Sequence, residues 1–526
     1  MFNWCESKNK PVFPSLRPGR ESAGFACIYG APGYTASVQL CLRDLEPFRI
    51  LGVTIDGGVG EDIKYWYNFQ EYIVYNDMTP YPDPLSASYS PSPEGIYGCL
   101  PAAEQPPLEV KSHFTQSIWL SLDIQRGAAP GKRGFTAMVE TDRGTFSFSV
   151  LLDIIPTAVP EIKDAAFSVE HFINGFAGYG AEPWSEKWWD IWDSYAASLE
   201  LLRNNVLNVN PLTYLIHSGS RRISDDGWSF VWDDLDRYVS IFMSHGETAV
   251  ACSSLIASVW GKTMSGIGYD GIGTYEIFTD DCEKWAKAFY TALYDHCREK
   301  GWTLYMRLED EPHQKEYWLW ARERVRRYMP GIKCGEPIDT HEIGMELQGE
   351  CDQLIPRTNV YTQGRDYYVT RQAKGDECWV YTCCLPEESW FMNRFIDQPF
   401  TYSKLLIWGC HVLGVTGYLH WGYTAWSDTS LYGTGPDARF KGDGFLVYPD
   451  PEHGVFRYST RFFAMRDGIR DYELLKLCPD ADAKAVTGSV VRGFDDFDAS
   501  PEKLDEAERR IFSLAALSAE THQAEK

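Results

Sequence analysis

The amino-acid sequence predicts a multidomain β plus α/β protein with an N-terminal β-sandwich, a TIM-type (β/α)8 barrel and a short helical C-terminal tail. Its 526 residues exceed what one ordinary domain contains. Short apolar runs that alternate with polar residues fill the first 160 positions, and beyond them short strands alternate with amphipathic helices. We therefore assign residues 1–160 to the sandwich, 161–478 to the barrel and 479–526 to the tail.

The sandwich is predicted by strand-like runs with no long helical period between them. In such runs alternate side chains face opposite sides of a sheet, so one face is buried and the other is solvated. Turn-rich sequence, notably residues 79–101, separates the runs, and residues 154–160 form the expected linker to the barrel. The expected strands span residues 36–42, 50–55, 65–75, 117–124, 134–140 and 145–154.

The barrel is predicted by about eight repeats of strand, loop and helix, the pattern of a parallel α/β barrel. The expected strands span residues 166–173, 206–211, 248–257, 302–308, 332–335, 353–356, 378–383 and 416–421. The expected helices span residues 186–203, 232–244, 280–300, 315–329, 402–413 and 456–477. In the tail, Ser500-Pro501 opens a charged helix that we expect to be a solvated appendage.

Charge and composition exclude several classes of partner. The net charge is −25, whereas nucleic acids and anionic membrane surfaces attract basic patches. The longest apolar helical run, residues 405–415, is too short to span a bilayer. A neutral small-molecule or oligosaccharide substrate suits this charge. Aromatic residues make up 15% of the chain, and their faces stack on sugar rings, although core packing uses the same residues. The oligomeric state is left open.

The cysteines and the N-terminus indicate the compartment. The 14 cysteines show no zinc-type spacing, and Cys383 and Cys384 are neighbours on an expected strand, where adjacent side chains point to opposite faces. We expect free thiols in a reducing compartment. Residues 1–10 contain no apolar signal core. A soluble cytoplasmic protein is expected, although a chain whose signal peptide had been removed would look the same.

No motif indicates a cofactor. Gly266-x-Gly268-x-x-Gly271 has the spacing of a dinucleotide-binding loop, but it does not open a helix directly after a strand. We therefore interpret it as a flexible loop and predict no cofactor.

Three consecutive carboxylates end the fourth expected barrel strand, in Leu308-Glu309-Asp310-Glu311-Pro312. The ends of parallel barrel strands are where such folds place their chemistry. A metal site is conceivable, but neighbours on a strand alternate faces and three in a row rarely converge, so we predict no metal. Consecutive Asp and Glu suit substrate-assisted cleavage of a 2-acetamido sugar, whose own acetamido oxygen attacks. Asp310 then holds the acetamido N–H, and Glu311 protonates the leaving group.

Further candidates for substrate binding lie at or after other strand ends. Trp421 ends the last expected strand, where an indole face can floor a sugar subsite, and Tyr381 lies near the end of the seventh. For each, plain packing is the alternative. The remaining candidates are Trp426, Asn393, Arg394, Asn208 and Glu336, and pairing of Arg394 with Asp397 is the structural alternative in the seventh loop.

Seven motifs occur in one order along the barrel sequence. They are Asp310-Glu311-Pro312, Trp379-x-Tyr381-x-Cys383-Cys384, Asn393-Arg394-Phe395-Ile396-Asp397-x-Pro399, Gly417-x-Leu419-x-Trp421, Gly442-Asp443-Gly444-x-Leu446-x-Tyr448-Pro449, Ser459-x-Arg461 and Arg466-Asp467-Gly468-Ile469-x-Asp471-Tyr472-Glu473. This set resembles glycoside hydrolase family 123 and its uncharacterised relatives, over about residues 163–477. The resemblance implies β-N-acetylgalactosaminidase-type activity on a barrel that follows a β-sandwich, with the roles given above for Asp310 and Glu311.

The sequence departs from that family pattern in places: Arg470 stands where the family usually has Glu, and Glu309 adds a charge beside the pair. The expected function is a retaining, exo-acting glycosidase for β-linked 2-acetamido sugars. The alternatives are a glycosidase for a different sugar, a non-catalytic carbohydrate-binding protein on the same barrel, and a metal-dependent hydrolase.

Overall fold

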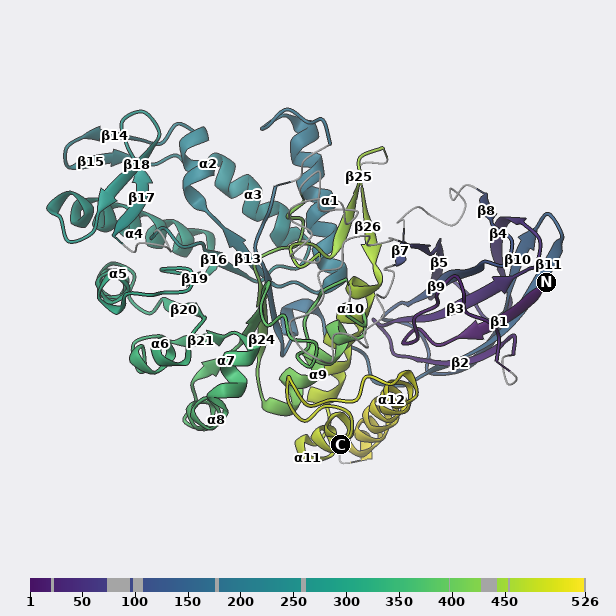
Figure 1. The fold of residues 1–526 in the computed structure, drawn as a ribbon. Coiled ribbons are helices and arrows are strands. Elements are labelled where there is room, and N and C mark those ends of the chain that lie inside the picture. The colour runs from purple at the N-terminus through teal and green to yellow at the C-terminus, as the bar shows by residue number, and fades with distance from the viewer. Residues whose placement is uncertain are drawn as a thin grey trace.

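The computed structural model has a β-rich N-terminal region on one side, a parallel barrel on the other, and the last helix packed between them (Figure 1). It describes residues 1–19, 23–72, 95–97, 107–175, 179–256, 262–396, 398–426, 442–452 and 455–524. In this part of the chain no helix combines the length and apolar character needed to span a bilayer.

Two sheets form the N-terminal region and share one apolar core. The first has the order β1 (Phe2–Glu6), β3 (Thr35–Arg43), β9 (Thr115–Ile124), β5 (Ile63–Phe69), and the second β2 (Phe25–Gly30), β11 (Gly144–Ile154), β10 (Gly131–Thr141), β4 (Phe48–Asp56), β8 (Leu108–Val110). All pairs are antiparallel except β2 with β11. Leu40 and Leu120 of the first sheet meet Val139 and Val150 of the second in the core. The predicted β-rich region is confirmed.

A small third sheet ties the N-terminal region to the barrel. It has the order β25 (Val447–Asp450), β26 (Val455–Ser459), β7 (Gly95–Tyr97), β6 (Glu71–Tyr72), so segments more than 300 positions apart pair with each other. The expected strand at 65–75 is split between β5 and β6, and its last residues, like most of the expected turn region 79–101, lie outside the described residues.

A nearly closed, all-parallel barrel follows. Its strands are β12 (Ser168–His171), β13 (Val206–Val209), β16 (Ala249–Cys252), β19 (Thr303–Met306), β20 (Lys333–Ile338), β21 (Gln353–Pro356), β22 (Glu377–Cys378), β23 (Val380–Thr382) and β24 (Gly417–His420). The nine run in the order β22-β21-β20-β19-β16-β13-β12-β24-β23. Only Trp379 separates β22 from β23, so the two ends of the sheet lie one residue apart in the chain. The mixed β and α/β class is confirmed.

Helices surround the barrel and follow most of its strands (Figure 1). They are α1 (Glu186–Leu202), α2 (Pro211–His217), α3 (Asp233–Ser244), α4 (Asp280–Lys300), α5 (Lys315–Tyr328), α6 (His341–Glu346), α7 (Thr358–Gln363), α8 (Arg365–Ala373), α9 (Tyr402–Leu413) and α10 (Thr460–Lys476). A short 3-10 helix at Ile162–Asp164 precedes the first barrel strand. Two hairpins, β14 (Arg221–Ser224) with β15 (Gly227–Ser229) and β17 (Thr263–Ile267) with β18 (Ile272–Glu276), interrupt the repeat. The Gly266-x-Gly268-x-x-Gly271 motif spans the turn of the second hairpin, so it opens no helix.

The expected helix 456–477 is corrected at its start. Residues 455–459 form strand β26, and the helix begins only at Thr460, after the Ser459 hydroxyl accepts the backbone N–H of Phe462. The run Val455-Phe456-Arg457-Tyr458 is aromatic and β-branched, which favours a strand when a partner edge is present. The partner edges are β25 and β7.

The expected solvated tail is also corrected. Helices α11 (Asp480–Gly488) and α12 (Pro501–Ala524) are present, but α12 is packed rather than solvated. Leu504, Ile511 and Phe512 are buried, and the Phe512 ring packs against Tyr34 at a centroid distance of 5.1 Å. One face of the charged helix therefore joins the main core, while its charged residues either reach solvent or pair with charges on other elements.

Five charged side chains, four of them buried and Lys8 partly exposed, join the N-terminus, α9, α10 and α12, and we call them the interface cluster. They are Lys8, Lys404, Asp467, Asp471 and Glu508. Lys8 Nζ lies 2.7 Å from an Asp467 oxygen and 3.3 Å from Glu508, and Lys404 donates to Glu508. Asp471 accepts the Tyr34 hydroxyl at 3.0 Å. Each acidic side chain in this cluster therefore has a cation or a neutral donor beside it.

Candidate active site

The C-terminal end of β19 places three carboxylates on one rim of the barrel. An isolated parallel bridge between Ile256 and Glu309 keeps the chain extended past the strand, and Leu308 packs outward into the core under the helices. Arg307 points into the barrel, where it meets Glu170 of β12. We call Glu309, Asp310 and Glu311 the strand-end cluster.

Glu311 is held in a strained backbone conformation and by one strong hydrogen bond. Its φ of +50° lies in the left-handed region, which costs a non-glycine residue of order 1–3 kcal/mol. Such strain persists only where the surroundings impose it, and it is typical of active sites. The buried Tyr381 hydroxyl donates to Glu311 Oε1 at 2.5 Å. One carboxyl oxygen is thereby fixed, and the pKa of Tyr381 is raised well above its usual value by burial and by the charge of Glu311.

Asp310 reaches solvent, yet protein atoms and other acids crowd its carboxyl group. Its pKa is raised to about 6, first by the displacement of water around it and then by repulsion from Glu311 and Asp339. Its charge changes within the range of pH in which enzymes work.

Glu309 is fully buried and is the most isolated of the three. Neither of its carboxyl oxygens has a hydrogen-bond partner among the described residues. Burial, followed by repulsion from Asp310, raises its pKa to about 8. At neutral pH this side chain is therefore largely a neutral carboxylic acid, since an unpaired buried charge is costly.

A buried polar network supports the strand end from inside the barrel. Arg307 donates to Glu170, to Gln353 Oε1 at 3.0 Å and to the Gly335 carbonyl at 3.2 Å. Asn208, one of the predicted binding residues, donates to Glu170 Oε1 at 2.8 Å. These contacts cross the barrel from β12 and β13 to β19, β20 and β21, so they fix the strand that carries the carboxylates.

Glu336 supports the same segment from its other side. Its carboxyl group accepts the backbone N–H of Leu308 and lies 3.4 Å from that of Glu309. It is fully buried, and burial raises its pKa well above the usual value, although the two backbone donors and Arg307 oppose this shift. Glu336 was predicted to bind substrate, and the structure places it against the backbone of the strand end.

Arg357 is a further rim residue that the sequence analysis did not consider. It directly follows β21 and forms an isolated bridge with Tyr381. Its guanidinium donates to Asn359 Oδ1 at 2.9 Å and to the Asp339 carbonyl at 3.1 Å. Burial alone would lower its pKa, but interactions with Tyr381, Cys383 and the carboxylates of Glu311 and Asp339 raise it. Its position one residue after a barrel strand was the signal that could have identified it.

Trp421 is oriented by a buried aspartate. Its indole N–H donates to Asp443 Oδ2 at 2.5 Å, and His420 Nε2 lies 3.0 Å from Asp443 Oδ1. His420 Nδ1 lies 3.0 Å from the backbone N–H of Gly422 and 3.1 Å from its carbonyl oxygen. Burial and the charge of Arg394 lower the pKa of His420 to about 4. Trp421 is half-buried, so part of the oriented ring remains accessible.

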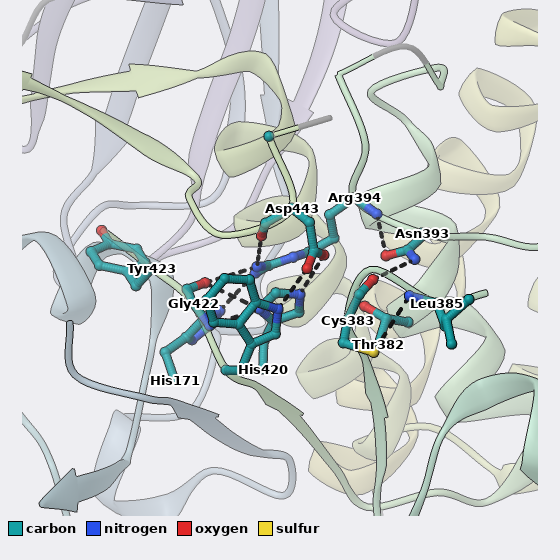
Figure 2. A network of polar contacts seen from close by, with 12 residues as sticks. His171, Thr382, Cys383, Leu385, Asn393, Arg394, His420, Gly422, Tyr423 and Asp443 are labelled. Carbon is teal, nitrogen blue, oxygen red and sulfur yellow. Dashed lines mark hydrogen bonds and ion pairs between the residues drawn. The ribbon is translucent and has the colours of Figure 1, made fainter. Parts of the chain in front are cut away.

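The remaining predicted residues lie in the loops that hold this arrangement (Figure 2). Arg394 is fully buried and donates to His171 and to the carbonyls of Gly422 and Asp443 at 2.9–3.1 Å. Asn393 donates to the carbonyls of Cys383 and Pro386 at 2.9 and 3.0 Å. The alternative partner of Arg394, Asp397, lies outside the described residues.

Two more expectations concern side chains beside these loops. Trp426 donates to the Val447 carbonyl at 2.9 Å and packs on Tyr179. Cys383 and Cys384 follow the end of β23 and lie in a bend, so strand alternation does not separate them, and their thiols interact.

Of the predicted residues, Asp310, Glu311 and Tyr381 meet at one rim, and Trp421 lies on the neighbouring strand of that rim. Asn208 and Glu336 brace the strand end, whereas Asn393, Arg394 and Trp426 have polar groups engaged by the protein. In the described part of the chain, no group of three His, Cys, Asp or Glu side chains is placed to hold a metal ion.

A family model for the catalytic domain of glycoside hydrolase 123 matches residues 174–478, which is more than half of the chain. The barrel therefore lies in the catalytic domain of a glycosidase. The chain belongs to glycoside hydrolase family 123.

One solved structure agrees at the level of the fold. A family 123 glycoside hydrolase from Clostridium perfringens, described as hydrolysing glycolipid glycans, superposes with a TM-score of 0.74 at 14% identity, covering 99% of each chain. A putative α-galactosidase from Bacteroides fragilis is far less similar, with a TM-score of 0.30 at 9% identity over 88% of this chain and 80% of that one. No curated protein matches the chain.

Proposed function

We propose that this protein is a retaining, exo-acting glycosidase that removes β-linked 2-acetamido sugars of the N-acetylgalactosamine type by a substrate-assisted mechanism. The observation that carries the proposal is the adjacency of Asp310 and Glu311 at the end of β19, with Tyr381 fixing one oxygen of Glu311 at 2.5 Å. A conventional retaining pair uses two carboxylates about 5–5.5 Å apart on either side of the bond. Two consecutive residues suit the variant in which the substrate supplies the nucleophile.

In the first step, the acetamido carbonyl oxygen attacks the anomeric carbon while the bond to the leaving oxygen breaks. Glu311 gives its proton to that oxygen through the carboxyl oxygen that Tyr381 leaves free. Asp310, as the carboxylate, accepts the acetamido N–H and stabilises the positive charge of the bicyclic intermediate. In the second step, Glu311 takes a proton from water as the water oxygen attacks the anomeric carbon. The acetamido group is regenerated, and two inversions retain the configuration.

Trp421 is the proposed floor of the sugar subsite. Its ring is fixed by the hydrogen bond to Asp443, so stacking on a sugar costs little further ordering. In the same proposal Glu336, Asn208, Asn393 and Arg394 act by positioning the rim, and Trp426 acts by packing the loop after β24.

The substrate is proposed to be a neutral glycan with a terminal 2-acetamido sugar, such as that of a glycolipid. The activity described for the Clostridium perfringens relative supports the class of glycan, and the net charge of −25 disfavours anionic glycans. No cofactor takes part in this scheme.

We also propose the finer architecture. If β22 and β23 are halves of one strand interrupted at Trp379, the barrel has eight strand positions and is a (β/α)8 barrel. Two sheets around one core make the N-terminal region a β-sandwich. The proposed domains are residues 1–160 and 161–478, followed by the helical segment 479–526.

The test compares Glu311→Gln and Asp310→Asn on a natural 2-acetamido glycoside and on an activated aryl glycoside of the same sugar. Glu311→Gln should lower kcat/KM by roughly 10²–10⁴-fold on the natural glycoside and far less on the aryl one, whose leaving group needs no proton. Asp310→Asn should be severe on both. Equal losses for both variants on both substrates would refute the assignment, and activity on plain hexosides alone would indicate a different sugar. Binding of sugars with no cleavage at all would indicate a non-catalytic protein.

A further inference from the structure

A cavity of about 240 Å³ lies beside the strand-end cluster, at the C-terminal ends of β12, β13 and β16 and under α1 and α2. Figure 1 shows α2 beyond the ends of β13 and β16. The cavity is lined by Ile173, Asn174, Gly175, Trp188, Trp192, Asn208, Val209, Asn210, Thr213, Tyr214, Tyr238 and Ser253. Its volume is below the range of about 300–1,000 Å³ typical of drug-sized ligands, so its occupant is small.

The chemistry of the lining is neutral in a strongly acidic protein. None of the twelve residues is Asp, Glu, Lys, Arg or His, although the chain carries a net charge of −25. One wall is aromatic, with Trp192 packed against Tyr238 at a centroid distance of 5.2 Å. The rest carries amides and hydroxyls. An ionic ligand would find no counter-charge here, whereas a polyhydroxylated neutral ring would find both an apolar face and polar groups.

Several polar groups in the cavity retain hydrogen-bonding capacity. Asn210 uses its side-chain oxygen to cap α2, and its amide N–H groups bond to no described residue. Thr213 is exposed, so its hydroxyl is open to solvent at the edge of the cavity. Asn208 donates one amide N–H to Glu170, and its second N–H is available to a ligand. Ser253 donates to Asn208 Oδ1 at 2.5 Å, and its hydroxyl oxygen can still accept a hydrogen bond. These groups are the kind that hydroxyls of a sugar bind.

The cavity is connected to the carboxylate rim by fixed contacts. Asn208 bonds to Glu170, which in turn accepts Arg307, three residues before Asp310. Ser254, the neighbour of Ser253, donates to the Leu308 carbonyl at 2.9 Å. Because β16 pairs directly with β19, the cavity and the strand-end cluster occupy adjacent positions on one rim.

We infer that this cavity is a subsite for a neutral, uncharged sugar unit of the substrate that is not itself cleaved. The inference rests on the proposed function in one respect: the cleaved sugar occupies the carboxylate rim, and the rest of the glycan extends toward α1 and α2. A uronic acid or a sialylated unit does not fit, because the lining offers no cation.

The test uses Thr213→Phe, which places a large side chain at the exposed edge of the cavity without touching the carboxylate rim. The two substrates are an aryl 2-acetamido-β-galactoside and a trisaccharide with the same sugar linked to a neutral disaccharide. We expect KM for the trisaccharide to rise by about tenfold, whereas kcat/KM for the aryl glycoside stays within about twofold. Thr370→Phe, at an exposed threonine of α8, is the matched control and should change neither.

Unchanged trisaccharide kinetics, or equal losses on both substrates, would overturn the inference. If Thr213→Phe fails to fold, Thr213→Val removes only the hydroxyl and should raise KM for the trisaccharide about two- to tenfold, with the same reading of the outcomes. If the unmodified enzyme cleaves neither substrate, the proposed function has failed, and the cavity is tested by saturation-transfer NMR with free galactose and galacturonate. Galactose binding that Thr213→Phe abolishes, with no galacturonate binding, supports the subsite, and any other result refutes it.

Discussion

The molecule contains two clusters of buried or crowded carboxylates, and they differ in the cations beside them. In the interface cluster, Lys8 and Lys404 contact the acidic side chains. They lower the pKa of Glu508 and Asp467 against the opposing effect of burial. In the strand-end cluster, burial and mutual repulsion prevail, and the pKa values of Asp310 and Glu309 are raised to about 6 and about 8.

The difference separates a structural site from a chemical one. Carboxylates that are paired with cations are charged at all ordinary pH values and hold elements together. Crowded carboxylates that form no ion pair with a cation change protonation near neutral pH, as proton transfer requires. One member of the interface cluster, Asp471, has a pKa raised to about 7 by burial and by Glu508, but Tyr34 and Trp408 donate to it and no open rim adjoins it. A raised pKa therefore indicates chemistry only in combination with access.

The largest effect on stability is expected from breaking the interface cluster. Lys404→Met leaves Glu508 buried without its main partner, and loss of one member of a buried pair costs about 3–5 kcal/mol. Urea denaturation should show this loss, while kcat/KM of the folded enzyme stays within about twofold. Lys484→Met, at an exposed pair with Asp480, is the control and should cost less than about 1 kcal/mol. Equal stability of the two variants would mean that the cluster is not structural.

Opposite pH dependences of stability should follow for Glu309→Gln and Asp467→Asn. The pKa of Glu309 is raised, so its contribution is present below pH 4.5 and is lost as pH rises to about 8. The free energy of unfolding of Glu309→Gln should equal that of the parent protein at low pH and exceed it by about 2–4 kcal/mol at high pH. The pKa of Asp467 is lowered, so Asp467→Asn should be less stable at neutral pH and approach the parent below its ordinary value of 3.8. If the difference in stability from the parent protein changed with pH in the same direction for both variants, the predicted contrast between the two clusters would be wrong.

A smaller effect concerns Asp310 and the acid limb of activity. If the Asp310 carboxylate is required, kcat/KM of the unmodified enzyme should fall as pH decreases through about 6. The same raised pKa makes the ionised form slightly destabilising, over the window from 3.8 to about 6. Because solvent reaches the side chain, Asp310→Asn should raise the free energy of unfolding by less than about 1 kcal/mol at neutral pH. Below pH 3.8 it should not change that free energy. An acid limb near pH 4 would argue against Asp310.

The finest comparison uses two buried tyrosines that each donate to a carboxylate. Tyr381 donates to Glu311 at 2.5 Å and Tyr34 to Asp471 at 3.0 Å. Tyr381→Phe should lower kcat/KM by about tenfold with little change in stability, since it releases the acid from its position. Tyr34→Phe should lower stability by about 1–2 kcal/mol with unchanged kinetics. Thermal unfolding and steady-state assays on both variants test this prediction. If Tyr34→Phe lowered kcat/KM and Tyr381→Phe lowered only stability, the assignment of a catalytic role to Tyr381 and a structural role to Tyr34 would be wrong.

Much of the fold could be predicted from the sequence because residues near the ends of helices and strands mark where those elements stop. Helices α4 and α9 have the expected bounds, since Gly301 and Gly414 terminate them in left-handed conformations. The start of α10 was missed because the strand before it pairs with β25, which was not expected, and with the distant segment β7. The packing of α12 was missed because the partners of Glu508 lie far away in the sequence.

Residues of the candidate site could be predicted from the sequence where they lie at the end of an expected barrel strand. Asp310, Glu311 and Tyr381 were placed by the rule that parallel strands end on one rim, and that rule also covers Arg357. Asp443 was quoted only as part of a motif, because it lies 22 positions after Trp421 and no expected strand points to its role beside that residue. The raised pKa of Glu309 depends on burial that no local pattern reveals.

The packing of α12 against the N-terminus also sets an order of events during synthesis. Asn9 donates to Asp505, a residue 496 positions later in the chain. At roughly 5–20 residues per second, a ribosome needs about 25–100 s to make the intervening chain. During that time Lys8 lacks its partner Glu508, and the face of the N-terminal sheets around Tyr34 lacks its contact with Phe512. Helix α12 therefore closes a region made 496 positions earlier in the chain, and a chain released before residue 508 exposes the unfilled seam to proteases and chaperones.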